Sequence, residues 1–256
     1  NAAVQNYNVS IRGGSPKTSY YASISYKDQD GIVKGSNSRN FGGRFNFESM
    51  ASDKLKFGMN MDASSRTANN KDNMISTLIN MRPDYPAYNE DGSINTIDYY
   101  TKNPLIEWMD LNHSTSRNIN ASAFLEYNIF KFLKFRTTLN AQYGNVKSES
   151  FSRRSYDGAN NSGSQRDAQN YTMVWDNLLT FYKDMRKHDV QAMLGHSVEH
   201  VSSDYMSAGG TDYPDDDILT NLGSAANRTS MNSNKTACSL VSVFARAQYK
   251  YDNRYL

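Results

Sequence analysis

Cysteine, proline and long apolar runs are all scarce in this chain of 256 residues. It has five prolines and a single cysteine, Cys238, so neither an internal disulfide framework nor a Cys-x-x-Cys metal site is available. No apolar run approaches the roughly 20 residues of a transmembrane helix. Lysine and arginine total 28 against 26 acidic residues, a net charge of +2. This balance gives no argument for a nucleic-acid partner.

What the chain has in abundance is alternation, although its mean hydropathy is only -0.73. Between residues 54 and 64, Leu55, Phe57, Met59 and Met61 are apolar and their neighbours are mostly polar or charged. A period of two residues is typical of a β-strand with two different faces. The pattern predicts nine strands, near residues 6–12, 20–27, 41–48, 54–64, 118–127, 133–143, 171–181, 189–199 and 241–249.

The lengths of these segments and of their connections are unusual for a globular protein. The expected strands have roughly 9–13 residues, whereas globular strands mostly have about 5–6 and a tilted strand needs about 9–11 to cross a bilayer. Short and long connections alternate along the chain, which sorts them to opposite ends of an antiparallel sheet. That arrangement is typical of outer-membrane barrels. The long connections are expected at about 28–38, 64–116, 145–168 and 200–237.

Aromatic residues gather near both ends of the expected apolar faces. Tyr171 and Phe181 are ten steps apart, which at roughly 3.3 Å a step and a tilt near 40° gives a height of about 25 Å, that of an outer-membrane apolar band. We therefore expect the apolar side to face lipid and the polar side a hydrated or plugged lumen. The alternative is a soluble sandwich with these faces as its core. Small residues such as Ala121 and Ala123 argue against a core, which needs volume.

Several stretches resemble one family, the SusC/RagA-like TonB-dependent outer-membrane transporters of Bacteroidetes. The resemblance rests on "YNVSIRGGSPKTSYYASISYKDQDGIVKGSNSRNFGGRFNFES" (7–49), "LKFGMNMDASS" (55–65), "NPL" (103–105) and "SVFARAQYKYDNRYL" (242–256). It implies a 22-stranded barrel, an N-terminal plug and a TonB-contacting segment. No plug pattern is present here, and the chain opens and closes within the strand pattern. Residues 1–256 are therefore expected to be a partial barrel domain, an internal piece of a longer protein.

The resemblance also implies a function and partners. It implies active import of a glycan or peptide at the bacterial outer membrane, without enzymatic activity. The implied partners are a SusD-like surface lipoprotein, outer-membrane lipid, and TonB through a segment outside this chain. The alternative function is a soluble or cell-surface β-rich binding domain that transports nothing.

The longest connection, 64–116, is the segment where binding residues are expected, because loops of this length usually bind something or are disordered. It offers Tyr99, Tyr100 and Trp108, with Asp110 close by in sequence. Aromatic faces beside carboxylates suit sugar stacking and hydroxyl hydrogen bonds. The alternative is that these residues only pack the loop against its neighbours.

The same loop also contains a possible short helix. Met74, Leu78 and Met81 have helical spacing, with Asp72 placed to cap the start and Pro83 to stop the helix.

Metal and catalytic chemistry find little support in the sequence. The segment 196–200 has the pattern H-x-x-E-H of some zinc peptidases, but that pattern needs a helix. In a strand, His196 and His200 would stand about 13 Å apart, too far to share one ion. The acidic run Asp215, Asp216 and Asp217 is a candidate for Ca²⁺, with a solvated loop as the alternative; no other cofactor is expected.

Overall fold

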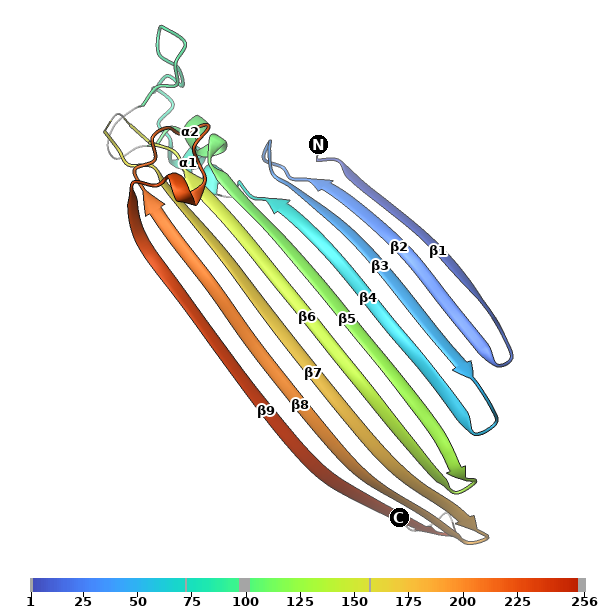
Figure 1. Ribbon diagram of the computed structural model, residues 1–256. Coiled ribbons are helices and arrows are strands. Elements are labelled where there is room, and N and C mark those ends of the chain that lie inside the picture. Colours follow the sequence, from blue (N-terminus) through green and yellow to red (C-terminus); the bar gives the residue numbers. More distant parts are fainter. Residues whose placement is uncertain (1, 72, 97–101, 157, 253–256) are drawn as a thin grey trace.

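The computed structural model describes residues 2–71, 73–96, 102–156 and 158–252. Their strands form one antiparallel sheet of nine strands, in which spatial order follows chain order from β1 to β9 (Figure 1). The all-β fold predicted from the sequence is therefore confirmed, and the sheet is open between its edges, β1 and β9. The strands are β1 (Val4–Ser15), β2 (Thr18–Asp30), β3 (Asn37–Met50), β4 (Leu55–Asn69), β5 (Leu111–Phe130), β6 (Leu133–Ser152), β7 (Ser162–Met185), β8 (His188–Thr211) and β9 (Asn227–Tyr251).

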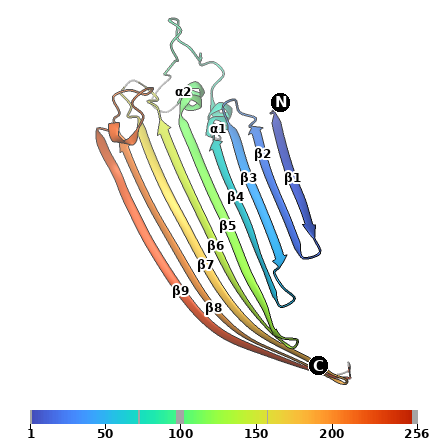
Figure 2. The same ribbon diagram turned by 45° about the vertical axis from the view of Figure 1, so that its right-hand side comes forward.

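The connections are sorted by length, as predicted. Short turns join β1 to β2, β3 to β4, β5 to β6 and β7 to β8 at one end of the sheet. The longer connections, 31–36, 70–110, 153–161 and 212–226, lie at the other end. The helices α1 (Asn73–Asn80) and α2 (Pro104–Met109) and the 3-10 turn η1 (Leu222–Ser224) belong to these loops, and Figure 2 shows α1 and α2 beyond the ends of the strands. Within the described ranges, no helix has the length and apolarity needed to cross a membrane.

The strands are longer, and the loops correspondingly shorter, than the alternation predicted. Strand β1 has 12 residues and β9 has 25, and the extra residues of β9 lie toward the long-loop end. The last loop therefore spans 212–226 instead of 200–237. Where both faces of a strand are exposed to water, apolar and polar residues no longer need to alternate along it. The backbone groups still need partners, and the ladder therefore continues.

Within the described ranges, the sheet has no hydrophobic core of its own. Among the residues described, the buried apolar ones are Ile106, Phe151 and Tyr213, which all lie at the long-loop end. Phe57 is 38% exposed and Met59 40%, and the described chain has no second sheet to cover them. The sandwich alternative is therefore wrong for the fold, because a sandwich buries one face of each sheet.

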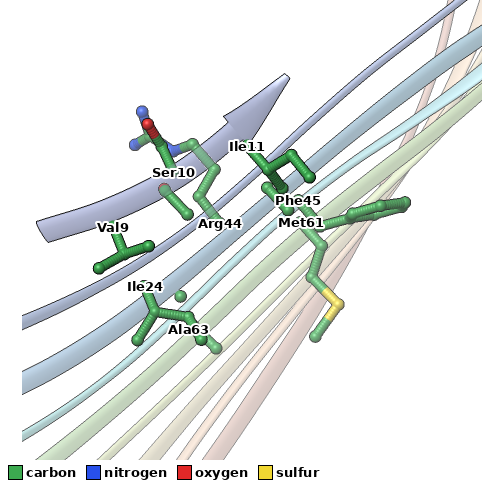
Figure 3. Close-up of a pocket in the computed structure, with 11 residues that line it drawn as sticks. Val9, Ser10, Ile11, Ile24, Arg44, Phe45, Met61 and Ala63 are labelled. Atoms are coloured by element: carbon green, nitrogen blue, oxygen red, sulfur yellow. The ribbon is translucent and has the colours of Figure 1, made fainter. Parts of the chain in front are cut away.

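Neighbouring strands align their apolar residues into continuous rows. Phe45 pairs with Met61 and Met61 with Ala121, while Gly43 pairs with Ala63. Small residues at Ala22, Gly43 and Ala63 leave a shallow apolar hollow of about 390 Å³ on this face, and Figure 3 shows the side chains around it. The face is thus apolar and uneven, which suits contact with flexible acyl chains.

Candidate functional site

The long-loop end is held together by a short helix, α2. Asn103 precedes α2 and accepts a hydrogen bond from the backbone N–H of Leu105 at 3.0 Å, capping the helix. The Nδ2 of Asn103 donates to the carbonyls of Ala87 at 3.0 Å and Asn95 at 2.8 Å. The side chain is almost fully buried. The side-chain amide of Asn103 therefore joins the start of α2 to the part of the same loop that contains Ala87 and Asn95.

Trp108 joins α2 to a different loop. Its Nε1 donates to the carbonyl oxygen of Lys34 at 2.6 Å, at the tip of the β2–β3 connection. The neighbouring Gly35 has φ +90°, and a Cβ there would lie 3.2 Å from Nε1 of Trp108. The indole was expected to contact ligand or to pack its loop against neighbours, and its polar edge makes the second kind of contact. Stacking of its ring on a ligand stays a prediction.

Asp110 closes α2 and binds a third segment. Its carboxylate accepts from Lys102 Nζ at 2.5 Å, from Ser152 Oγ at 3.1 Å and from the backbone N–H of Arg153 at 2.8 Å. The ammonium of Lys71 also donates to the Asp110 carbonyl, and burial lowers the pKa of Lys71. Asp110, expected as a binding residue, is thus occupied in joining β6 to the loop, and its role toward a ligand stays a prediction.

Asn161, the last residue of the β6–β7 loop, makes the hydrogen bonds that hold the loop after β8 in place. Its side chain is fully buried, accepts from the Tyr213 N–H at 2.6 Å and donates to Asp216 Oδ1 at 2.6 Å. Arg154 pairs with the same carboxylate of Asp216 at 3.2 Å. Phe151 packs edge-on against Tyr213, with ring centroids 5.0 Å apart. This cluster contains Phe151 and Tyr213, two of the three buried hydrophobic residues of the described ranges.

The acidic run 215–217 has its oxygens turned to three different tasks. Asp215 accepts backbone N–H groups of Asp217, Ile218 and Leu219, and these bonds hold its pKa below the usual range. Asp216 pairs with Arg154, and Asp217 with Arg153 at 2.5 Å. In the described ranges no three His, Cys, Asp or Glu residues are grouped to hold a metal ion. Calcium binding here stays an untested alternative.

The remaining sequence candidates fall in two places. Tyr99 and Tyr100 lie outside the described residues. His196 and His200 lie in β8, so the prediction of a strand at H-x-x-E-H is confirmed, and the helix of a zinc peptidase is not formed. Sequence reasoning missed Asn103 and Asn161. Asn103 carried a signal, since an asparagine followed by proline is typical of a helix start.

The polar face of the sheet is rich in paired charges. Lys56 pairs with Glu48 at 2.8 Å, and Glu126 with Lys134 at 3.1 Å. Arg136 lies over the ring of Phe124, 4.4 Å from its centroid. These residues alternate with the apolar ones, so they share the opposite face. Such a surface can hold water or a polar protein segment against the strands.

Comparison with known proteins points to one family. No family model matches the chain. TonB-dependent receptor P26 of Formosa agariphila is 28% identical over 272 residues, which cover 100% of this chain and 27% of the relative. TonB-dependent receptor P3 of the same organism is 25% identical over 274 residues, covering 99% of this chain and 27% of that relative. The chain thus spans little more than a quarter of each.

The solved structures agree on the fold. The structure of the RagAB peptide transporter superposes with a TM-score of 0.80 at 22% identity, covering 98% of this chain and 30% of that chain. The RagAB peptide importer in its 'open-open' state gives a TM-score of 0.78 at 21% identity, over 96% of this chain and 30% of that one. The resemblance to SusC/RagA-like TonB-dependent transporters and the outer-membrane location predicted from the sequence are confirmed, and the fold of the chain is similar to a stretch of their β-barrel.

Proposed function

We propose that the whole protein imports a peptide or a glycan across the outer membrane, and that this chain is part of its barrel wall. The observation that carries the proposal is the single sheet whose apolar face is left half-exposed while its polar face carries paired charges. An apolar band on one side and a hydrated surface on the other are what a transmembrane barrel needs. Relatives named TonB-dependent receptors support the same activity.

The long-loop end is the proposed side of substrate entry. Its loops are tied to one another by Asn103, Trp108, Asp110 and Asn161, so they form a built structure instead of separate connectors. Binding sites need such pre-formed surfaces, because ordering loose segments on binding costs free energy. Tyr99, Tyr100, Trp108 and Asp110 are the proposed contacts.

The proposed partners follow from the two ends of the barrel. A SusD-like surface lipoprotein would cover the long-loop end, and TonB would act from the short-turn end through a segment outside this chain. A RagAB complex among the similar structures supports the first of these partners. In the proposed mechanism the substrate is bound at the long-loop end and then released with energy supplied through TonB. No covalent chemistry takes place in this chain.

A deletion strain tests the proposal. Growth of the strain is compared with that of the complemented strain on defined peptide pools and on defined oligosaccharide pools, each as sole source. Loss of growth on one pool, restored by the wild-type gene, is expected and would identify the substrate class. Equal growth of both strains on every pool of molecules too large to diffuse through porins would contradict import as the function.

A further inference from the structure

The polar face of the sheet carries charge of one sign near the long loops. From the row that pairs Ser64 with Asn118 up to the ends of the strands, alternation places Lys27, Arg66 and Arg166 on this face. It places no acidic residue of the described strands there. The paired charges of the polar face all lie on the other side of that row, toward the short turns.

The carboxylates at the same level of the strands lie on the opposite face. Asp28 pairs there with Arg39 at 3.2 Å, and Glu149 pairs with Lys147 at 2.7 Å. The three basic residues of the polar face make no ion pair within the described ranges. Their positive charge is therefore not compensated by this part of the chain.

Arg66 lines a hollow of about 530 Å³ on the polar face, between β2 and β5. The other side chains that alternation turns into this hollow include hydroxyls and amides, those of Gln29, Ser38, Asn112, Ser114 and Ser116. Asp30 also borders the hollow, but it follows Gln29 in β2 and so belongs to the opposite face. The hollow thus combines one cationic group with neutral hydrogen-bonding groups.

The guanidinium of Arg66 is positioned by one hydrogen bond. Its Nε donates to Ser38 Oγ at 2.9 Å, while neither terminal nitrogen makes a hydrogen bond within the described ranges. Lys27 lies in the same row as Arg66, with Asn40 between them. Two strand spacings put these two cations about 10 Å apart. Free terminal nitrogens of an arginine form a planar fork that matches the two oxygens of a carboxylate.

We propose that this hollow binds a carboxylate of the imported substrate, with the guanidinium of Arg66 as its principal contact. The inference rests on the import function proposed above and narrows the substrate to acidic molecules. The two terminal nitrogens of Arg66 donate to the two carboxylate oxygens, and Lys27 adds positive charge nearby. The surrounding hydroxyls and amides hydrogen-bond the neutral part of the substrate. Acidic peptides and oligosaccharides with uronic acids present the same group, so both sources enter the test.

Uptake of native and neutralised substrates tests the proposal. A pool of acidic peptides and a pool of oligosaccharides with uronic acids are each offered before and after their carboxylates have been converted to methylamides. Mass spectrometry follows the disappearance of each pool from the medium, in the complemented strain and in the deletion strain. We expect the complemented strain to take up the native form of one pool about tenfold faster than its amide, the scale of a charge-assisted pair of hydrogen bonds. The pool that shows this preference identifies the source of the carboxylate.

Variants of the full-length protein connect the preference to Arg66. Arg66→Gln removes the charge and the fork, so both forms should be taken up at the slow rate of the amide, after correction for surface abundance. Arg66→Lys keeps the charge but loses the fork, and should keep part of the preference. Arg39→Gln is the matched control, because Arg39 lies on the neighbouring strand and on the opposite face. Its preference should equal that of the wild type.

The outcomes separate this proposal from the import function. Equal uptake of native and amidated pools by the wild-type protein would overturn the carboxylate site and leave import in place, and this comparison needs no variant. A full preference in Arg66→Gln would overturn the site in the same way. If no pool disappears faster in the complemented strain than in the deletion strain, the import function is contradicted, and the carboxylate site with it.

Discussion

The indole nitrogen of Trp108 lies 2.6 Å from the carbonyl oxygen of Lys34, which joins α2 to the tip of a hairpin 74 residues earlier in the chain. This bond, the amide of Asn103 and the carboxylate of Asp110 attach three connections to one short helix. The long loops of this protein are therefore a joined structure on top of the barrel wall.

Loss of the Trp108 hydrogen bond should loosen the β2–β3 loop. Trp108→Phe keeps an aromatic ring but removes the donor, which costs about 1 kcal/mol for an ordinary hydrogen bond. Because Lys34 stands in the exposed loop 31–36, trypsin added to intact cells should cleave after Lys34 faster in this variant. Identical cleavage rates in the variant and the wild type would show that the bond does not hold the loop.

Trp108→Ala separates packing from ligand contact. If the ring also stacks on substrate, affinity should fall by about 1–3 kcal/mol, the scale of a buried aromatic contact. Trp108→Phe should retain most of that affinity, since it still offers a ring. Affinity measured against surface abundance checks this; equal affinity in wild type and Trp108→Ala would assign the residue to loop structure alone.

Asn161→Ala should disorganise the loops 153–161 and 212–226. The substitution leaves the N–H of Tyr213 without its acceptor in a buried place, which costs about 1–3 kcal/mol. Hydrogen exchange in both loops should rise. Asn160→Ala is the matched control, because Asn160 is exposed, and protection should stay at the wild-type level there. Unchanged exchange in Asn161→Ala would contradict the role given to this side chain.

Asp215 should make the last long loop sensitive to acid. Its pKa is depressed by backbone N–H donors, so its stabilising contribution is present above the unfolded value of about 3.9 and is lost as pH falls through the lower folded value. Exchange protection of Ile218 and Leu219 should therefore drop below about pH 4. Asp215→Asn keeps an acceptor that does not titrate, and its protection should change less with pH. An equal drop in both proteins would assign the effect to other carboxylates.

Met59→Arg should destabilise the barrel by about 2–4 kcal/mol, because it places a charge on the apolar side, which we propose faces lipid. Asn60→Arg, one residue later and on the opposite face, should have little effect. Urea unfolding of the full-length protein in lipid measures both. A similar loss for the two variants would contradict the assignment of faces.

The alternation at Met59 and Met61 was enough to predict which residues share a face, because a one-residue slip would reverse the whole strand. It did not predict where β9 begins. Residues 227–239 are polar and alternate poorly, yet they belong to the ladder because their backbone groups pair with β8. The start of β9 is therefore set by backbone pairing with β8. The apolar and polar pattern of a single sequence indicates which residues are buried, but it does not indicate which backbone groups pair.

The loop cluster was predictable only in part. The Asn103–Pro104 pair is a local signal for the start of α2, because asparagine caps helices and proline favours their first position. The sequence around Asn161 and Tyr213 carries no signal of their contact, because the two residues are 52 positions apart. Each residue type is also common in exposed loops. Sequence patterns carry local propensities, and this cluster is built from contacts between distant loops.

Cysteine accessibility along β4 in native outer membranes tests the central claim most directly. Single cysteines at residues 55–63 of the full-length protein, without Cys238, are labelled with a fluorophore and exposed to a lipid-soluble or a water-soluble quencher. The account predicts a period of two: positions 55, 57, 59, 61 and 63 are quenched by the lipid-soluble agent, and positions 56, 58, 60 and 62 are not. Uniform quenching along the strand, or the opposite phase, would contradict a lipid-facing apolar side.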